Sequence, residues 1–137
     1  MPSSTFAIVQ QFSEDLAKKK HDFSADTFKV ALVNAARSLT VAVLADVTEI
    51  SYTNCSSRTI AGITSEQTAG VTTLTMTDLV LTASGGSVGP FRAIYVYNDT
   101  AAGDLIVGGW DYGSALTLLD GQTLTIDVGA SGLGTIA

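Results

Sequence analysis

Residues 82–113 (TASGGSVGPFRAIYVYNDTAAGDLIVGGWDYG) constrain the fold of this chain more than any other segment. From Phe91 to Asn98 the side chains alternate between two sets, the period-2 pattern of a β-strand. Both sets contain apolar residues, so this strand is expected to be buried on both faces. Asn, Asp and Gly follow as turn residues, and residues 105–110 are expected to return beside the first strand. The segment therefore predicts a β-hairpin with a loop at each end.

Further short strands are expected along most of the chain. Asp120-Gly121, between the last two of them, is a strong hairpin signal. Residues 6–20 are the one helical candidate of any length because apolar residues recur there at helical spacing, with a strand over residues 6–12 as the alternative. The sequence predicts a mainly β fold, an antiparallel β-sandwich or jelly-roll-like barrel with one N-terminal helix. The further strands are expected at residues 27–33, 59–64, 70–76, 78–82, 114–119 and 122–128.

The 137 residues are enough for one domain and too few for two. We expect an N-terminal segment with the helix (1–22), a β-core (23–128) and a small, apolar C-terminal tail (129–137). The tail is expected to add an edge strand or to lie over a neighbouring chain. Residues 34–48 are expected to be a loop or a short helix, and residues 51–57 a loop.

Composition narrows the classes of partner. Charged residues make up 15% of the chain, against about 25% in an average protein. The polar surface must therefore come largely from the 18 Thr and 13 Ser, and a surface with so little charge favours association with other subunits. The net charge of −6, and the lack of any basic residue after Arg92, argue against a nucleic-acid-binding face. Residues 18–20, three lysines, are expected to be a solvated helix end. No apolar run approaches the roughly 20 residues of a membrane span.

Few residues could support catalysis or hold a cofactor. His21, the one histidine, is expected to lie on the surface in a turn, and Cys55, the one cysteine, in a polar loop without a base beside it. The glycines of residues 85–89 lack the P-loop pattern and precede a strand, which favours a turn. The aspartates after residue 98 match no calcium-loop spacing and are expected to form turns. We therefore expect no catalytic residues, no cofactor and no metal.

Five residues are candidate packing or interface anchors. Trp110 and Tyr112 flank an aspartate in a segment bounded by glycines. They are expected either to anchor a binding interface or to have structural roles, with Trp110 filling the core and Tyr112 capping the sheet. Arg92 is the only positive charge in its strand, so we expect a carboxylate partner, either Asp99 or Asp111. The five anchors are Pro90, Phe91, Arg92, Trp110 and Tyr112.

Several of these segments, in order along the chain, resemble one family. They are residues 12–21 (FSEDLAKKKH), 24–32 (SADTFKVAL), 45–50 (ADVTEI), 82–92 (TASGGSVGPFR), 97–100 (YNDT) and 110–114 (WDYGS). Together they resemble small structural proteins encoded among the virion genes of tailed bacteriophages. The likeness extends from residue 12 to about residue 127, and residues 82–92 and 110–114 are its most specific parts. The chain departs from the pattern at residues 52–69, which are poorer in glycine, and at Ala93.

The resemblance implies a virion component without enzymatic activity, made in the host cytoplasm. A decoration or cement protein on the outer face of the capsid is the first expectation, with the major capsid protein or another virion protein as partner and a homo-oligomer on the particle. Nucleic acid and membranes are not expected partners. A tail, neck or fibre-attachment component is the alternative. A carbohydrate-binding β-sandwich, with Trp110 and Tyr112 stacking on sugar, is a second alternative from another class.

Overall fold

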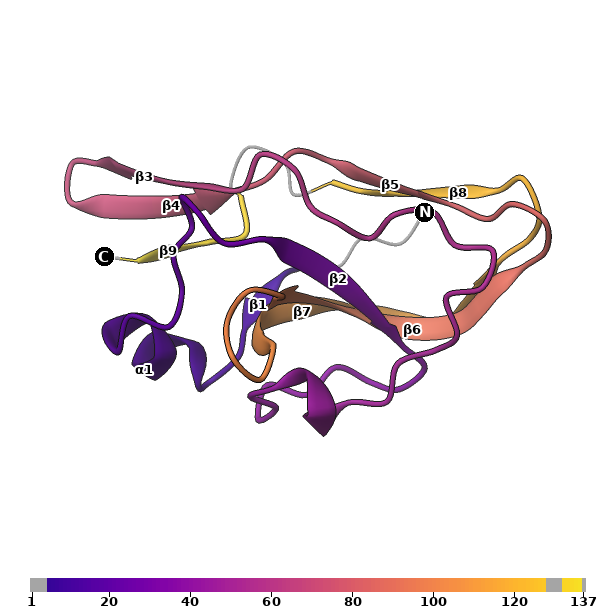
Figure 1. The fold of residues 1–137 in the computed structure, drawn as a ribbon, viewed down its shortest axis with the longest axis horizontal. Coiled ribbons are helices and arrows are strands. Elements are labelled where there is room, and N and C mark those ends of the chain that lie inside the picture. Colours follow the sequence, from indigo (N-terminus) through magenta and orange to yellow (C-terminus); the bar gives the residue numbers. More distant parts are fainter. Residues whose placement is uncertain (1–4, 128–131, 137) are drawn as a thin grey trace.

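The computed structural model describes residues 5–127 and 132–136 and confirms a mainly β, antiparallel fold with one short N-terminal helix, α1 (Phe12–Ala17). One layer is a four-stranded sheet in the order β1-β7-β6-β2, and a three-stranded sheet (β3-β4-β9) and a two-stranded sheet (β5-β8) lie side by side in the other (Figure 1). The strands are β1 (Ala7–Ile8), β2 (Phe28–Val33), β3 (Thr64–Thr68), β4 (Val71–Thr75), β5 (Leu79–Thr82), β6 (Val88–Asn98), β7 (Leu105–Leu118), β8 (Thr123–Ile126) and β9 (Gly134–Ile136).

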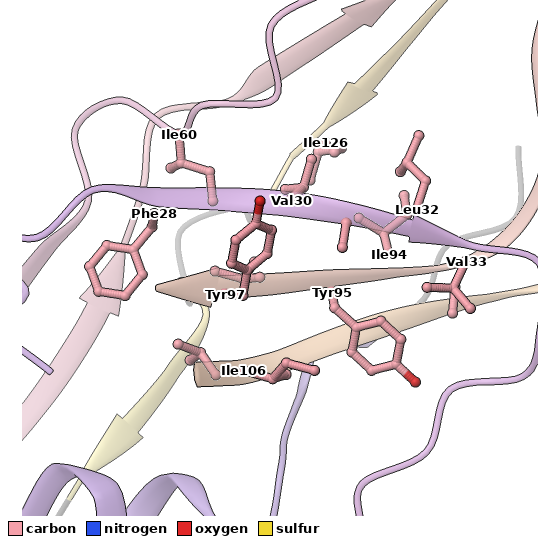
Figure 2. Packing of buried hydrophobic residues seen from close by; sticks show 14 of the residues in the cluster. Phe28, Val30, Leu32, Val33, Ile60, Ile94, Tyr95, Tyr97, Ile106 and Ile126 are labelled. Atoms are coloured by element: carbon pink, nitrogen blue, oxygen red, sulfur yellow. The ribbon is translucent and has the colours of Figure 1, made fainter. Parts of the chain in front are cut away.

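The core lies on both faces of the pair β2–β6. Val30 of β2 stands opposite Val96 of β6, and Leu32 opposite Ile94. Every residue from 93 to 98 is buried, as the alternation of two apolar faces predicts. Figure 2 shows Ile60 and Ile126, which come from outside this sheet, beside the side chains of β2 and β6. On the other side, the Tyr95 hydroxyl accepts a hydrogen bond from the backbone N–H of Ser38, 2.8 Å away.

The hairpin β6–β7 is longer than the sequence predicted. Residues 111–113 were expected to be a turn and residues 114–119 a separate strand, but β7 continues through both. The strand continues because it bulges there: Phe91 pairs with Leu116 and Ala93 with Asp111, so residues 112–115 protrude. The glycine that suggested a turn, Gly113, has φ +91° within this bulge.

The hairpin predicted at Asp120-Gly121 is wrong in its pairing. The chain does turn there, yet β8 pairs with β5 instead of with β7. The register explains the choice, because it places Leu81 beside Leu124 and buries both. The Gly121 N–H donates to the Ala83 carbonyl at 2.8 Å, which ties the turn to the end of β5.

The helix predicted over residues 6–20 is shorter than expected. Residues 7–8 form β1 against Gly108 and Gly109 of β7, as the strand alternative anticipated in part. A Cβ on Gly108 would lie 2.3 Å from the Ala7 carbonyl oxygen, so a glycine is needed for this approach. The helix stops at Ala17, and Lys19 already has φ +63°. The three lysines that follow the helix are exposed, as predicted.

The strand predicted at residues 59–64 is also wrong. That stretch is irregular, and the strand falls at β3 (Thr64–Thr68), whose five side chains are all exposed. Its polar sequence gave no alternation to detect. Residues 34–48 contain only a short 3-10 helix (Leu44–Asp46), and residues 51–57 are a loop as expected. From the predicted tail, β9 adds an edge strand to β4, while residues 129–131 and 137 lie outside the described residues.

Candidate functional site

The two most distinctive segments of the sequence, residues 82–92 and 110–114, meet at one point on β6 and β7. The Arg92 guanidinium donates from Nε to Asp111 Oδ1 at 2.9 Å and from Nη2 to Oδ2 at 3.4 Å. Asp111 is therefore the predicted carboxylate partner of Arg92. The other candidate, Asp99, pairs with Lys29 at 3.1 Å instead.

The carboxylate of Asp111 also holds the bulge in place. Its oxygens accept the backbone N–H of Gly113 at 2.8 Å and that of Arg37 at 3.3 Å. The hydrogen bond from Arg92 is the main reason that the pKa of Asp111 lies below its usual range. The Arg37 guanidinium binds the carbonyl oxygens of Thr5 and Gly109, at 2.8 and 3.2 Å. These hydrogen bonds thus fix this part of β7 to β6 through Arg92 and to the loop after β2 through Arg37.

The bulge presents a small surface without charged side chains, which we call the bulge surface and define as Pro90 with residues 112–115. Pro90 and residues 113–115 are exposed, and Tyr112 is half-buried. On the side away from β6, residues 112–118 have no partner strand within residues 5–127 and 132–136. The bulge surface therefore lies beside an open strand edge.

The remaining sequence candidates have packing roles. Phe91 is buried in the core at 1% exposure. Trp110 stands opposite Ile94 and packs half-buried against Phe6, with the ring centroids 4.7 Å apart and the rings at 64°. This edge-to-face contact uses part of the indole surface. Of the five candidates, Pro90 and Tyr112 reach the bulge surface, Arg92 positions the bulge, and Phe91 and Trp110 pack.

His21 is buried at 6% exposure, so its predicted surface location is wrong. The Asn98 side chain lies between it and Asp26: Asn98 Nδ2 is 3.1 Å from His21 Nδ1 and donates to Asp26 Oδ2 at 2.6 Å. Phe12, Phe23 and Phe28 surround the imidazole with ring centroids 5.3 to 6.3 Å away. The lysines beside His21 in the sequence suggested solvent, but the phenylalanines decide its position.

A second polar cluster was not anticipated from the sequence. The Tyr52 hydroxyl donates to Glu49 at 2.5 Å and accepts the backbone N–H of Leu32 at 2.9 Å. Burial raises the pKa of Tyr52 far above its ordinary value. The Arg58 guanidinium lies 3.6 Å from the centre of the Tyr52 ring and binds the Val30 carbonyl oxygen at 2.8 Å. This cluster fastens the loop between β2 and β3 to the edge of β2.

The remaining candidates for chemistry have structural surroundings. Burial raises the pKa of the half-buried Cys55 thiol, which lowers its reactivity at neutral pH. Gly85 and Gly86 have positive φ, as a turn requires, and the Gly85 N–H donates to Asp120 at 3.0 Å. Among the described residues, no three His, Cys, Asp or Glu side chains are grouped so as to hold a metal ion. No helix in that part of the chain has the length and apolarity to span a membrane.

A scan against protein-family models, a search of curated proteins and a search of solved structures each found no match to this chain.

Proposed function

We propose that this protein is a non-enzymatic structural component of a tailed-bacteriophage particle, and specifically a decoration protein on the outer face of the head. The observation that carries the proposal is the meeting of residues 82–92 and 110–114, the most specific parts of the family resemblance. The two segments lie on the paired strands β6 and β7, where Arg92 and Asp111 join them beside an exposed surface. A family feature built in this way suits a docking function.

The bulge surface has the properties of a protein-binding site. An open strand edge offers backbone N–H and C=O groups to a partner. Tyr112 supplies a half-buried aromatic side chain of the kind enriched at binding hot spots. Pro90 and residues 112–115 include no charged residue. Docking on this surface therefore removes no charged side chain of the surface itself from water, and the desolvation cost is small.

The overall charge and the small size agree with a position outside the shell. A net charge of −6 disfavours contact with packaged DNA and favours the outer surface. Each copy needs only a modest contact area, because many symmetric copies on one shell stabilise it together. Trp110, half-buried against Phe6, is poorly disposed to stack on a sugar, so the carbohydrate-binding alternative is weaker.

Quantitative mass spectrometry of purified particles tests the location. A copy number close to that of the major shell protein supports decoration, whereas a few copies per particle indicate the tail or a vertex. Complete absence of the protein from particles contradicts a virion role and returns attention to the free binding module.

Two matched variants test the surface. Ala115→Arg places a long cation on the bulge surface, and Ala102→Arg makes the same change at an exposed position in the loop between β6 and β7. Binding to shells that lack this protein is measured by co-sedimentation. We expect Ala115→Arg to weaken binding about tenfold or more and Ala102→Arg to leave it unchanged. Equal binding by both variants would exclude the bulge surface as the docking site.

A further inference from the structure

His21 lies where α1, the following turn and the start of β2 meet the end of β6. Hydrogen bonds from Asn98 to Asp26 and from the Asp99 N–H to the Thr27 carbonyl also join the turn to the end of β6. The His21 ring contacts Phe12 of α1, Phe23 of the following turn and Phe28 at the start of β2. Its Nδ1 faces Asn98 at the end of β6. The side chain is 6% exposed, and the pocket of about 530 Å³ that it helps to line is bounded by this turn and by the loop after β6.

The hydrogen bonds of Asn98 determine the protonation state of the imidazole. Asn98 Oδ1 accepts the backbone N–H groups of Thr100 and Ala101, each at 3.0 Å, which fixes Nδ2 as the nitrogen. One hydrogen atom on Asn98 Nδ2 is donated to Asp26. The other points to His21 Nδ1, which must therefore accept it. His21 is thus the neutral tautomer with its proton on Nε2. A second proton, on Nδ1, would face an N–H donor.

The charged groups around the ring partly oppose one another. Asp15, from α1, and Asp26, from the turn, favour the charged imidazolium, and Lys20 disfavours it. Burial among the phenylalanines outweighs the carboxylates, so the pKa of His21 lies below that of an exposed histidine. Two atoms here, His21 Nε2 and Asp15 Oδ2, are buried without a hydrogen-bond partner. The cluster therefore holds a cost that a rearrangement on protonation would relieve.

We propose that His21 is a proton-operated latch: the neutral ring holds α1 and the following turn, residues 12–27, against the end of β6, and protonation releases them. In the released state the imidazolium is hydrated, or pairs with Asp15 or Asp26, and Asn98 is freed from the donor–donor conflict. The rest of the sheet is unaffected, because the pairing of β6 with β2 and β7 does not involve His21.

The direction of the pH effect follows from the lowered pKa. The unfolded or released segment binds the proton at a higher pH than the latched one does. The latch therefore contributes its full stability above the ordinary histidine pKa of about 6.5 and loses it as the pH falls below that value. The opening constant of residues 12–27 rises by up to tenfold for each pH unit between the two pKa values.

The wild-type protein allows a clean test because it contains a single histidine. NMR of the one imidazole Cε1–H signal reports its titration directly, and we expect a midpoint below about 6.5. Hydrogen exchange at about pH 7.5 and about pH 5.5, corrected for the intrinsic rate, should show faster opening of residues 12–27 in acid, with β6 and β7 still protected. A midpoint at or above that of an exposed histidine, or unchanged opening of residues 12–27, would overturn the proposal.

Two variants separate the latch from general acid sensitivity. His21→Gln keeps an oxygen that accepts from Asn98 but cannot titrate, so the acid-dependent opening should disappear. Asp15→Asn removes a carboxylate that favours the imidazolium, so the titration midpoint should fall further. If His21→Gln does not fold, the shift in Asp15→Asn together with the wild-type exchange pattern decides. Acid-dependent opening that persists in a folded His21→Gln variant would contradict the latch.

Discussion

Arg92 and Asp111 join β6 and β7 at the largest register shift between these strands. From Phe91 to Ala93 the chain of β6 advances two residues, while the paired positions on β7, Leu116 to Asp111, are five apart. The two-pronged ion pair closes the strands over this mismatch. The bulge surface therefore depends on one arginine and one carboxylate for its position.

Replacing Arg92 by alanine should lower the free energy of unfolding by roughly 1 kcal/mol, because the pair is partly exposed yet two-pronged. The side chains of Arg92 and Asp111 are 37% and 22% exposed. Urea denaturation of Arg92→Ala, Asp111→Ala and the double variant gives the coupling between them. Lys29→Ala, which breaks the single-contact pair with the similarly exposed Asp99, is the control and should cost about 0.5 kcal/mol or less. Equal losses for Arg92→Ala and Lys29→Ala would show that the bulge does not depend on Arg92.

Asp111 should also give the fold an acid limit of its own. Its pKa is lowered in the folded state, so its contribution is complete above the ordinary aspartate pKa of about 3.9 and is lost as the pH falls through the folded value. Asp111→Asn should flatten this part of the stability profile. Denaturation curves between about pH 2 and about pH 6 measure it. An unchanged acid slope in Asp111→Asn would assign that slope to other carboxylates.

Phe28 should be the most costly core side chain to truncate among those tested. It is fully buried and stacks on Phe23, with the ring planes 8° apart and the centroids 4.9 Å apart. Phe28→Ala should lower the free energy of unfolding by about 3–5 kcal/mol. Val80→Ala, at a position 48% exposed on β5, should cost less than about 1 kcal/mol. Chemical denaturation compares the two, and similar losses would place the effective core elsewhere.

Gly109 should not tolerate a side chain, although its backbone needs no positive φ. A Cβ there would lie 2.5 Å from the Ile94 carbonyl oxygen, an atom that cannot move without disturbing β6. Gly109→Ala should therefore cost about 1–3 kcal/mol. Thr117→Ala, an exposed position on the same strand, should change stability by about 0.5 kcal/mol or less. If thermal or urea denaturation finds Gly109→Ala neutral, β6 and β7 must be able to move apart easily at this point.

Period-2 alternation predicted the strands that bury at least one apolar face. Residues 91–98 and 27–33 were found on that basis, since buried strands repeat large apolar side chains. β3 was not found, because all its side chains face solvent and its sequence carries no face preference. Pairing partners were also missed. The choice of β5 as the partner of β8 depends on how Leu81 and Leu124 bury each other, which a local hairpin signal does not contain.

For the candidate site, charge reasoning was more successful than position reasoning. A lone arginine in an apolar strand requires a carboxylate partner, and Asp111, one of the two aspartates that the sequence offers for this role, is that partner. The location of His21 was wrong because neighbours in sequence, three lysines, are not its neighbours in space. The Asn98 amide that binds it is 77 residues away along the chain. Contacts of that range leave no trace in a local pattern.

The pairing of β8 with β5 and of β9 with β4 also sets the order in which the molecule can be completed during translation. The four strands of the sheet β1-β7-β6-β2 are all present once residue 118 has been made. The other layer then still lacks one strand from each of its two sheets. The four-stranded sheet can therefore pair before β8 and β9, which complete the two sheets of the other layer, have been made.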